Sequence, residues 1–345
     1  MSTKRELGIL STAWLRPVAA AAVFLAVLCA PAFAAKKPAA PAGPDYQGAV
    51  NAAHAKFVSL QEGKNADYIP ALAKVDPNIF GIALVTVDGK VFTMAKVMEE
   101  QGPDAIAKNM GVDATGQVFN SIVAVEQYKG SEINAMVNPG AITSTSMVSG
   151  ASRDEIWIKI LGFHSDFAGR TLTVNQEVFK SEAETNQRNQ AISMLMYAYG
   201  HIKDNPLQAC DIYTEQCAIS VNAKDLATMA ATLANGGLNP VTGKQCMNAA
   251  NVPKVLAVMA TAGLYDDSGK WLYTTGLPAK SGVGGGILAV SPGRFGIAVI
   301  SPPLDAAGNS VKAQKAIAEV SNTLGANPYA PNPAAPKTAE KGKKK

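Results

Sequence analysis

Residues 278–286 read PAKSGVGGG and combine three groups that can act on a carbonyl substrate. The ammonium group of Lys280 supplies positive charge, and the hydroxyl of Ser281 can donate a hydrogen bond. The glycines that follow let backbone N–H groups approach an oxyanion closely. A flexible glycine-rich loop is the alternative interpretation, so this stretch needs partners elsewhere in the chain.

Three further positions carry side chains suited to a polar ligand. Asn138 lies in NPGAI, which is typical of a turn. Glu182 and Asn189 lie in SEAETNQRN, which we expect to open a helix. Asparagine is also an ordinary residue at helix ends, so each position taken singly is consistent with a structural role.

The elements that must position these residues follow an α+β order. Strands are expected near both ends of the chain, at residues 80–87, 286–290 and 296–300. Helices are expected at residues 46–75, 190–199, 223–235, 252–263 and 311–324. We therefore predict one antiparallel sheet built from both ends of the chain, with flanking helices and an inserted helical lobe. The cleft between sheet and lobe is the expected position of a site.

The ends of the chain differ in composition from the middle. Residues 1–34 have the charged, apolar and small-residue order of a secretory signal peptide, with cleavage expected after Ala34. Residues 35–45 form a Pro/Ala linker, residues 46–326 the domain, and residues 327–345 a disordered basic tail. We expect a periplasmic or secreted protein with no stable membrane anchor after cleavage.

The charge and the cysteines restrict the partners. The net charge is +4, and no basic stripe with interleaved aromatic residues indicates a nucleic-acid partner. Cys210, Cys217 and Cys246 remain after cleavage, and a Cys210–Cys246 disulfide is the favoured pairing in an oxidising compartment. The histidines and cysteines show no metal-ligand spacing, so no metal site is expected.

Eight blocks of the sequence, taken in order, resemble the bacterial glutaminase family of the glutaminase A type over about residues 46–324. The blocks are IPALAKVDP, FGIALVTVDG, FNSIV, NPGAI, SEAETNQRNQAI, YTEQCAIS, DLATMAATLANGGLNPVTG and LPAKSGVGGGI. The resemblance implies a fold like that of serine β-lactamases and penicillin-binding proteins. The Lys-Ser-Gly of this chain resembles the K-T-G element of those proteins. It also implies hydrolysis of L-glutamine to L-glutamate and ammonia by acyl-enzyme chemistry, without a cofactor, in a homodimer or homotetramer.

The resemblance assigns roles to individual residues. The implied substrate-binding residues are Asn138, Glu182, Asn189, Tyr213, Tyr265 and Val283, and the implied catalytic residues are Lys90, Tyr213, Lys280 and Ser281. Glu182 and Asn189 are expected to hold the α-amino and α-carboxyl ends of glutamine. Tyr213 is expected to act as a base or proton relay, and the Val283 N–H to form half of an oxyanion hole.

One element departs from the family pattern. The family acylates a serine in S-x-x-K, where a lysine one helical turn later takes the serine proton. Lys90 matches that lysine, but Val87 stands at the serine position, and no serine in the chain has a lysine three residues later. Asp88-Gly89 is a hairpin signal by itself, yet the return strand and the connector expected after it are missing.

Three hypotheses remain open at this point: an acyl-enzyme glutaminase, a degenerate family member that binds glutamine without turnover, and a shortened variant of a normal enzyme. Thr93 with Lys96 offers a substitute hydroxyl and lysine one turn apart if a helix begins near Thr93. Thr338 with Lys341 has the same spacing but lies in the tail. The missing return strand is expected to leave the strand at residues 80–87 with an unpaired edge.

Overall fold

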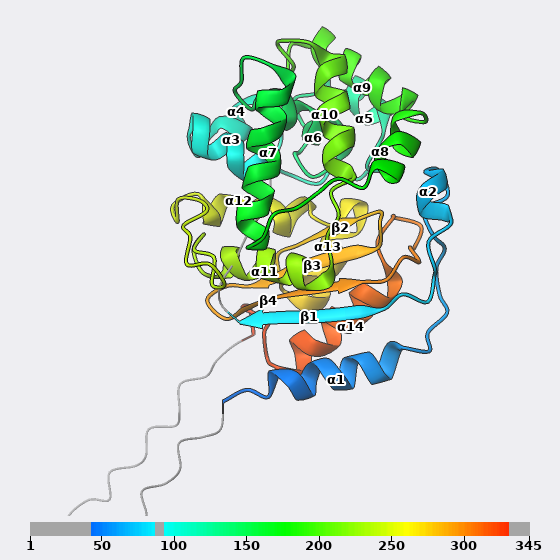
Figure 1. Ribbon diagram of the computed structural model, residues 1–345, viewed down its shortest axis with the longest axis vertical. Coiled ribbons are helices and arrows are strands. Elements are labelled where there is room, and N and C mark those ends of the chain that lie inside the picture. The colour runs from blue at the N-terminus through cyan, green and yellow to red at the C-terminus, as the bar shows by residue number, and fades with distance from the viewer. Residues whose placement is uncertain (1–42, 87–92, 331–345) are drawn as a thin grey trace, which may run out of the picture. The chain divides into compact units, whose positions relative to one another are not determined.

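The computed structural model describes residues 43–86 and 93–330 of the 345-residue chain. The described strands form one four-stranded antiparallel sheet in the order β1-β4-β3-β2. They are β1 (Gly81–Thr86), β2 (Ala279–Gly282), β3 (Gly286–Ser291) and β4 (Phe295–Ile300). The strand from the N-terminal part thus pairs with the C-terminal strands, which confirms the predicted α+β architecture (Figure 1).

Helix α11 (Ala223–Ala234) packs closely on one face of this sheet. Close packing depends on Gly296 of β4, because a Cβ atom there would lie 2.1 Å from the backbone nitrogen of Ala231. The helix contributes a nearly continuous buried alanine-rich surface. A small residue on the strand and small residues on the helix therefore let the two backbones approach.

The opposite face is covered by α1 (Tyr46–Phe57), α13 (Ser268–Thr275) and α14 (Val311–Thr323). Their apolar side chains form one buried cluster with alternate residues of β3 and β4. Because both faces of the sheet are covered, the central strands β3 and β4 are mostly apolar rather than alternating. Figure 1 shows α1 and α14 together on the side of the sheet away from the helical lobe.

Between β1 and β2 the chain forms mostly helices, which Figure 1 shows gathered beyond α11. The first group is α3 (Thr93–Gln101), α4 (Ala105–Asn109), α5 (Ile122–Tyr128), α6 (Asn138–Ser146) and α7 (Arg153–Ala168). The second group is α8 (Gln176–Ala183), α9 (Gln187–Ala198), α10 (Pro206–Cys217) and α12 (Val252–Ala262), with the 3₁₀ turn η1 (Tyr265–Asp267). We call α3–α10 the helical lobe.

The single helix predicted for residues 46–75 is wrong. The first helix ends at Phe57, and only the short α2 (Pro70–Ala73) follows before β1. Gly63 takes a φ of +90°, and the Lys64 N–H donates to the Leu304 carbonyl at 3.0 Å. Pairing with a distant segment, which no local pattern reveals, therefore interrupts the helix.

Two site segments also differ from their predicted local structure. NPGAI is not a turn but the start of α6, because a proline in the first helical turn loses no intrahelical hydrogen bond. Glu182 lies at the end of α8 rather than at the start of a helix, whereas Asn189 lies in the first turn of α9.

Val87, Asp88-Gly89 and Lys90 lie outside the described residues, so their predicted roles stay predictions. In the part of the chain that the structure describes, β1 pairs with β4 only, and its other edge has no strand partner. This agrees with the expected unpaired edge. Helix α3 begins at Thr93, as the substitute-hydroxyl hypothesis requires.

The part of the chain that the structure describes includes residues 46–326 except 87–92, and the predicted domain bounds stay a prediction. No helix in that part of the chain is long and apolar enough to cross a bilayer. The expected Cys210–Cys246 disulfide is wrong, since none of the three described cysteines forms one. Cys210 is buried in α10, whereas the Cys246 thiol donates to the Asp166 carbonyl at 3.4 Å.

Candidate active site

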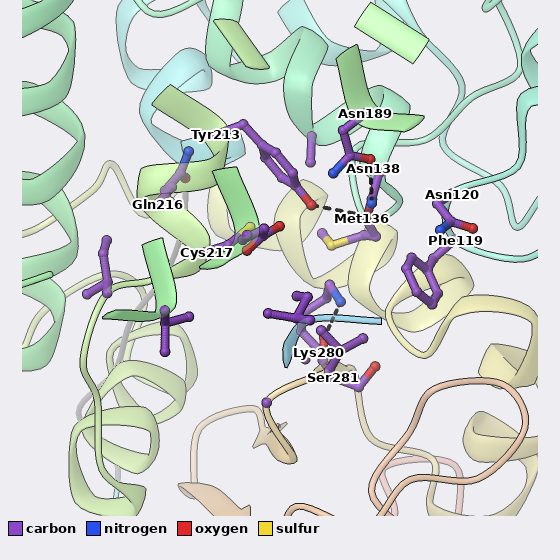
Figure 2. A pocket seen from close by; sticks show the side chains of 18 of the residues that line it. Phe119, Asn120, Met136, Asn138, Asn189, Tyr213, Gln216, Cys217, Lys280 and Ser281 are labelled. Carbon is purple, nitrogen blue, oxygen red and sulfur yellow. Dashed lines mark hydrogen bonds between the residues drawn. The ribbon is translucent and has the colours of Figure 1, made fainter. Parts of the chain in front are cut away.

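A cavity of about 410 Å³ is bounded by the helical lobe and by β2 with the turn that follows it. It gathers eight of the predicted site residues: Asn138, Glu182, Asn189, Tyr213, Tyr265, Lys280, Ser281 and Val283. Figure 2 shows Tyr213, Asn138 and Asn189 on one side of the cavity and Lys280 on the other. Lys90, the remaining predicted residue, lies outside the described residues.

Three side chains from three helices form a hydrogen-bonded chain on the lobe side (Figure 2). The Tyr213 hydroxyl of α10 donates to Asn138 Oδ1 of α6 at 3.0 Å. Asn138 Nδ2 in turn donates to Asn189 Oδ1 of α9 at 3.0 Å. This arrangement occupies the Asn189 oxygen, so its Nδ2 group is the part suited to donate to a carboxylate ligand.

Glu182 brings a nearly buried carboxylate to the cavity. The residue is only 8% exposed, and its carboxylate has no hydrogen bond within the described residues. Burial raises its pKa to about 7, because the charged form loses hydration without gaining a partner. A ligand ammonium group would supply that missing partner.

Lys280 lines the same cavity from β2. Its Nζ lies 4.4 Å from the centroid of the Tyr265 ring and donates to the Ser281 carbonyl. Burial lowers the pKa of this lysine to about 7. A lysine with such a pKa is partly neutral near pH 7 and can both accept and donate a proton.

Tyr265 holds a backbone conformation that is unusual for a tyrosine. Its φ is +56°, and the side chain is buried against Phe119 with ring centroids 4.9 Å apart. The Tyr265 hydroxyl donates to the Ser281 carbonyl at 3.4 Å. Backbone strain of this kind concentrates at binding and catalytic sites, where the surrounding structure maintains it.

Ser281 presents its backbone rather than its hydroxyl to Lys280. The Oγ atom is buried and has no hydrogen-bond partner among the described residues. Because successive side chains of a strand point to opposite faces, the Ser281 hydroxyl lies on the other face from Lys280. The Ser281 carbonyl accepts from both Lys280 and Tyr265, and the catalytic role predicted for Ser281 stays a prediction.

Val283 lies in the tight turn between β2 and β3 and lines the cavity. The turn requires Gly285, whose φ is +92° and whose added Cβ would lie 2.5 Å from Pro302 Cα. The turn is thus fixed against the segment that follows β4, which suits a backbone N–H that must keep its direction.

Sequence reasoning missed several residues that line the cavity, among them Tyr68, His164, Asn186, Gln216 and Cys217. Cys217 carried a usable signal, because it follows Tyr213 by four residues on one helix and so shares its face. The others come from segments whose approach to the cavity no local pattern reveals.

The substitute pair Thr93 and Lys96 is not supported by the position of its lysine. Lys96 Nζ lies 3.2 Å from Glu100 Oε1 and 5.9 Å from the centroid of the Phe163 ring. Lys96 is not among the described residues that line the cavity. A lysine held by a carboxylate is not available as a proton acceptor at the site.

Comparisons with known proteins agree with this geometry. A family model described as Glutaminase matches residues 63–98 and 89–329. The glutaminase of Brucella canis is 49% identical over 301 residues, covering 82% of this chain and 95% of that protein. The glutaminase of Mycobacterium marinum is 47% identical over 294 residues, covering 80% and 92% respectively.

Solved structures show the same similarity. The probable glutaminase ybaS superposes with a TM-score of 0.80 at 44% identity, covering 83% of this chain and 98% of that one. Mglu in its glutamate form superposes with a TM-score of 0.76 at 33% identity, covering 81% and 68%.

Proposed function

Because the chain belongs to the glutaminase family, we propose that its cavity binds L-glutamine and that the chain is an amidohydrolase that forms L-glutamate and ammonia. The observation that carries the proposal is the cavity's set of groups. An unpaired buried carboxylate, a chain of amides and a buried lysine face one another across a space that suits a small amino acid.

Each end of glutamine has a complementary group. Glu182 accepts from the α-ammonium group, which offsets the cost of burying its own charge. The Asn189 amide donates to the α-carboxylate. The carboxamide is then directed towards Tyr213, Lys280 and the Val283 backbone, where a developing oxyanion finds hydrogen-bond donors.

Ammonia release from L-glutamine by the mature chain tests the proposal. We expect release that saturates with glutamine, requires Glu182 and yields one glutamate per ammonia. The Glu182→Gln variant should lose at least about tenfold in kcat/KM, because one charge-assisted hydrogen bond to the substrate is removed. Unchanged kinetics in that variant would contradict the assignment of Glu182.

Glutamine binding without turnover is the second candidate function, and two observations favour it. The family model matches in two pieces that overlap at residues 89–98, where the sequence lacks S-x-x-K. The alignment with the Brucella canis protein spans 301 residues, more than 82% of 345, so it contains gaps on the side of this chain. A calorimetric titration that detects glutamine while no ammonia is released would select this function.

A shortened variant of a normal enzyme accounts for the same two observations. Re-sequencing the gene across codons 85–95 tests this idea. An intact serine codon upstream of the Lys90 codon would support it, and an unchanged sequence would dismiss it.

Export and assembly are part of the proposal. Cleavage after Ala34 would place the mature chain in the periplasm or outside the cell, and exposed Met194, Tyr197 and Leu207 offer an apolar surface to a second subunit. N-terminal sequencing of exported protein and light scattering of the purified chain check the two points. A mature chain that begins at Met1, or one that is monomeric, would contradict them.

A further inference from the structure

Cys217 brings a thiol to the cavity beside the residue expected to relay protons. It is the last residue of α10, one helical turn after Tyr213, and Figure 2 shows both facing the cavity space above Lys280. Its side chain is exposed to the cavity, whereas Cys210 is buried and Cys246 is not among the lining residues.

Polar groups of the cavity lie near this thiol, although burial has the largest effect on its pKa and raises it. The Tyr213 hydroxyl, which donates to Asn138 Oδ1, is also within hydrogen-bond reach of the thiol and favours the thiolate where it turns to donate there, and Lys280 favours the thiolate electrostatically. The Glu182 carboxylate, nine-tenths buried and without a hydrogen bond among the described residues, faces the same space. The unpaired carboxylate is an independent indication that a ligand with a cationic group binds in the cavity that this thiol lines.

The serine and threonine hydroxyls of the described cavity lining are either hydrogen-bonded to a carbonyl or buried away from the cavity. Ser144 Oγ donates to the Gly140 carbonyl at 2.8 Å, and Thr185 Oγ1 donates to the Ser181 carbonyl at 2.9 Å. The Ser281 Oγ atom is buried on the far face of β2. Among these groups the Cys217 thiol is the one with both a proton-accepting neighbour and an open surface.

We propose that the Cys217 thiol is the nucleophile that this chain offers to the carboxamide of bound glutamine. The inference rests on the proposed glutamine site and extends it. The reaction class is cysteine acyl transfer, with Lys280 as the proton acceptor and Tyr213 as the relay.

The step balances without an oxidant or cofactor. Cys217 Sγ forms a bond to the carboxamide carbon while its proton passes to the neutral Lys280 amine. That proton is then delivered to the leaving nitrogen, the C–N bond breaks, and ammonia departs from a γ-glutamyl thioester. Water attacks the thioester carbon, the C–S bond breaks, and L-glutamate and the free thiol are released.

Ligand charge removes the second of the two causes that keep the thiol protonated. Burial and then the Glu182 charge raise the pKa of Cys217 well above its usual range in the empty cavity. The substrate ammonium pairs with Glu182 and offsets that repulsion. Lys280, whose pKa burial lowers to about 7, is then partly neutral and able to take the proton.

The first experiment compares Cys217→Ala with the matched thiol control Cys246→Ser in the mature chain. We expect Cys217→Ala to lose about 1,000-fold or more in glutamine-dependent ammonia release, as removal of a nucleophile does. Its calorimetric affinity for glutamine should stay within about threefold, which shows that the variant is folded. Cys246→Ser should keep both activity and affinity. Turnover that survives in Cys217→Ala but disappears in Thr93→Val would overturn the inference.

The second experiment identifies the nucleophile directly. A glutamine analogue with a diazoketone in place of the carboxamide is incubated with the mature chain, and the labelled peptide is located by mass spectrometry. The expected adduct is on Cys217, formed as sulfur displaces dinitrogen from the protonated diazo carbon. An adduct on Thr93, or no adduct although glutamine binds, overturns this inference alone. Loss of glutamine binding itself contradicts the proposed function instead.

Discussion

At the scale of single residues, the site depends on two buried groups of opposite charge whose pKa values shift towards each other. Burial raises the pKa of the Glu182 carboxyl to about 7 and lowers that of the Lys280 ammonium to about 7. Each group therefore changes charge near neutral pH, where a free carboxylate or lysine would not. The cavity is poised to exchange protons in the range in which amide hydrolysis must proceed.

Stability measurements should reveal the Glu182 shift. Its folded-state pKa of about 7 exceeds the usual 4.5, so the folded chain binds this proton more tightly. The resulting stabilisation is complete below about pH 4.5 and is lost as the pH rises through 7. Relative to Glu182→Gln, the unfolding free energy of the wild-type chain should fall by on the order of 2–3 kcal/mol from pH 5 to pH 8.

Urea unfolding of both chains without ligand at the two pH values measures this change. The control is the exposed neighbour Glu184→Gln, which should show no comparable pH-dependent difference. A constant offset between wild type and Glu182→Gln at both pH values would show that burial does not shift this carboxyl.

The Lys280 shift predicts a pH profile for the reaction. As the pH rises from 6 to 8, the ammonium gives way to a neutral amine that accepts a proton, so kcat should rise through about pH 7. Lys280→Arg keeps the charge at every pH and should lose about 100-fold in kcat together with the rise. A profile whose midpoint is the same in both proteins would assign the titration to another group.

At the scale of elements, the site depends on how closely helices approach the sheet and each other. Helix α10 contributes Tyr213 and Cys217 from one face, and α6 and α9 hold the tyrosine through Asn138 and Asn189. Beneath them, α11 contacts β4 almost backbone to backbone at Gly296. A displacement of any of these helices would separate groups that now lie within hydrogen-bond distance.

Gly296→Ala should therefore destabilise the fold. The added Cβ would lie 2.1 Å from Ala231 N and 2.4 Å from Ala230 C, so α11 must move away from β4. We expect a loss of about 2–3 kcal/mol in urea unfolding, as for overpacked cores. The control is Gly162→Ala, at an exposed position of α7 where nothing lies near the added Cβ. Its free energy of unfolding should rise by up to about 1 kcal/mol. Equal effects of the two substitutions would contradict the close contact.

The sequence predicted the elements whose pattern is local. The strand positions β1, β3 and β4 and the helices α11, α12 and α14 agree with the predicted ranges within a few residues. Their apolar spacing or β-branched composition is visible in short windows. The helix predicted across residues 46–75 failed because pairing of Lys64 with Leu304 is a tertiary contact.

The site residues could be predicted from the resemblance, but their orientation could not. The sequence identified Lys280 and Ser281 together, yet only the strand geometry shows that their side chains point to opposite faces. The Asn138 segment looked like a turn because asparagine, proline and glycine favour turns, whereas the structure uses them to open α6. The spacing of Cys217 from Tyr213 was visible in the sequence, but its approach to Glu182 of α8 and Lys280 of β2 was not.

At the scale of the whole domain, segments from the two ends of the chain complete one structure. Helix α1 packs against α14 on the far face of the sheet, with Lys56 Nζ 2.7 Å from Glu319 Oε2 at the surface. Ala53 is fully buried within that contact. The helical lobe is inserted between β1 and β2, so the stability of the sheet supports the cavity above it.

Paired substitutions in α1 test this dependence. Ala53→Asp places a carboxylate in the buried contact and should cost at least about 3 kcal/mol of unfolding free energy. Ala52→Asp makes the same change on the exposed face of the helix and should cost less than about 1 kcal/mol. Chemical unfolding of both variants measures the difference. Similar losses would mean that α1 is not packed on the sheet as described.

Calorimetric titration of the mature chain with L-glutamine, beside the Glu182→Gln variant, is the decisive test of whether the cavity binds glutamine through Glu182. We expect one glutamine per chain and an affinity that falls at least about tenfold in the variant, since the substrate ammonium group loses its carboxylate partner. Failure to bind glutamine, or equal affinity in the two proteins, would contradict the assignment of this cavity as a glutamine site.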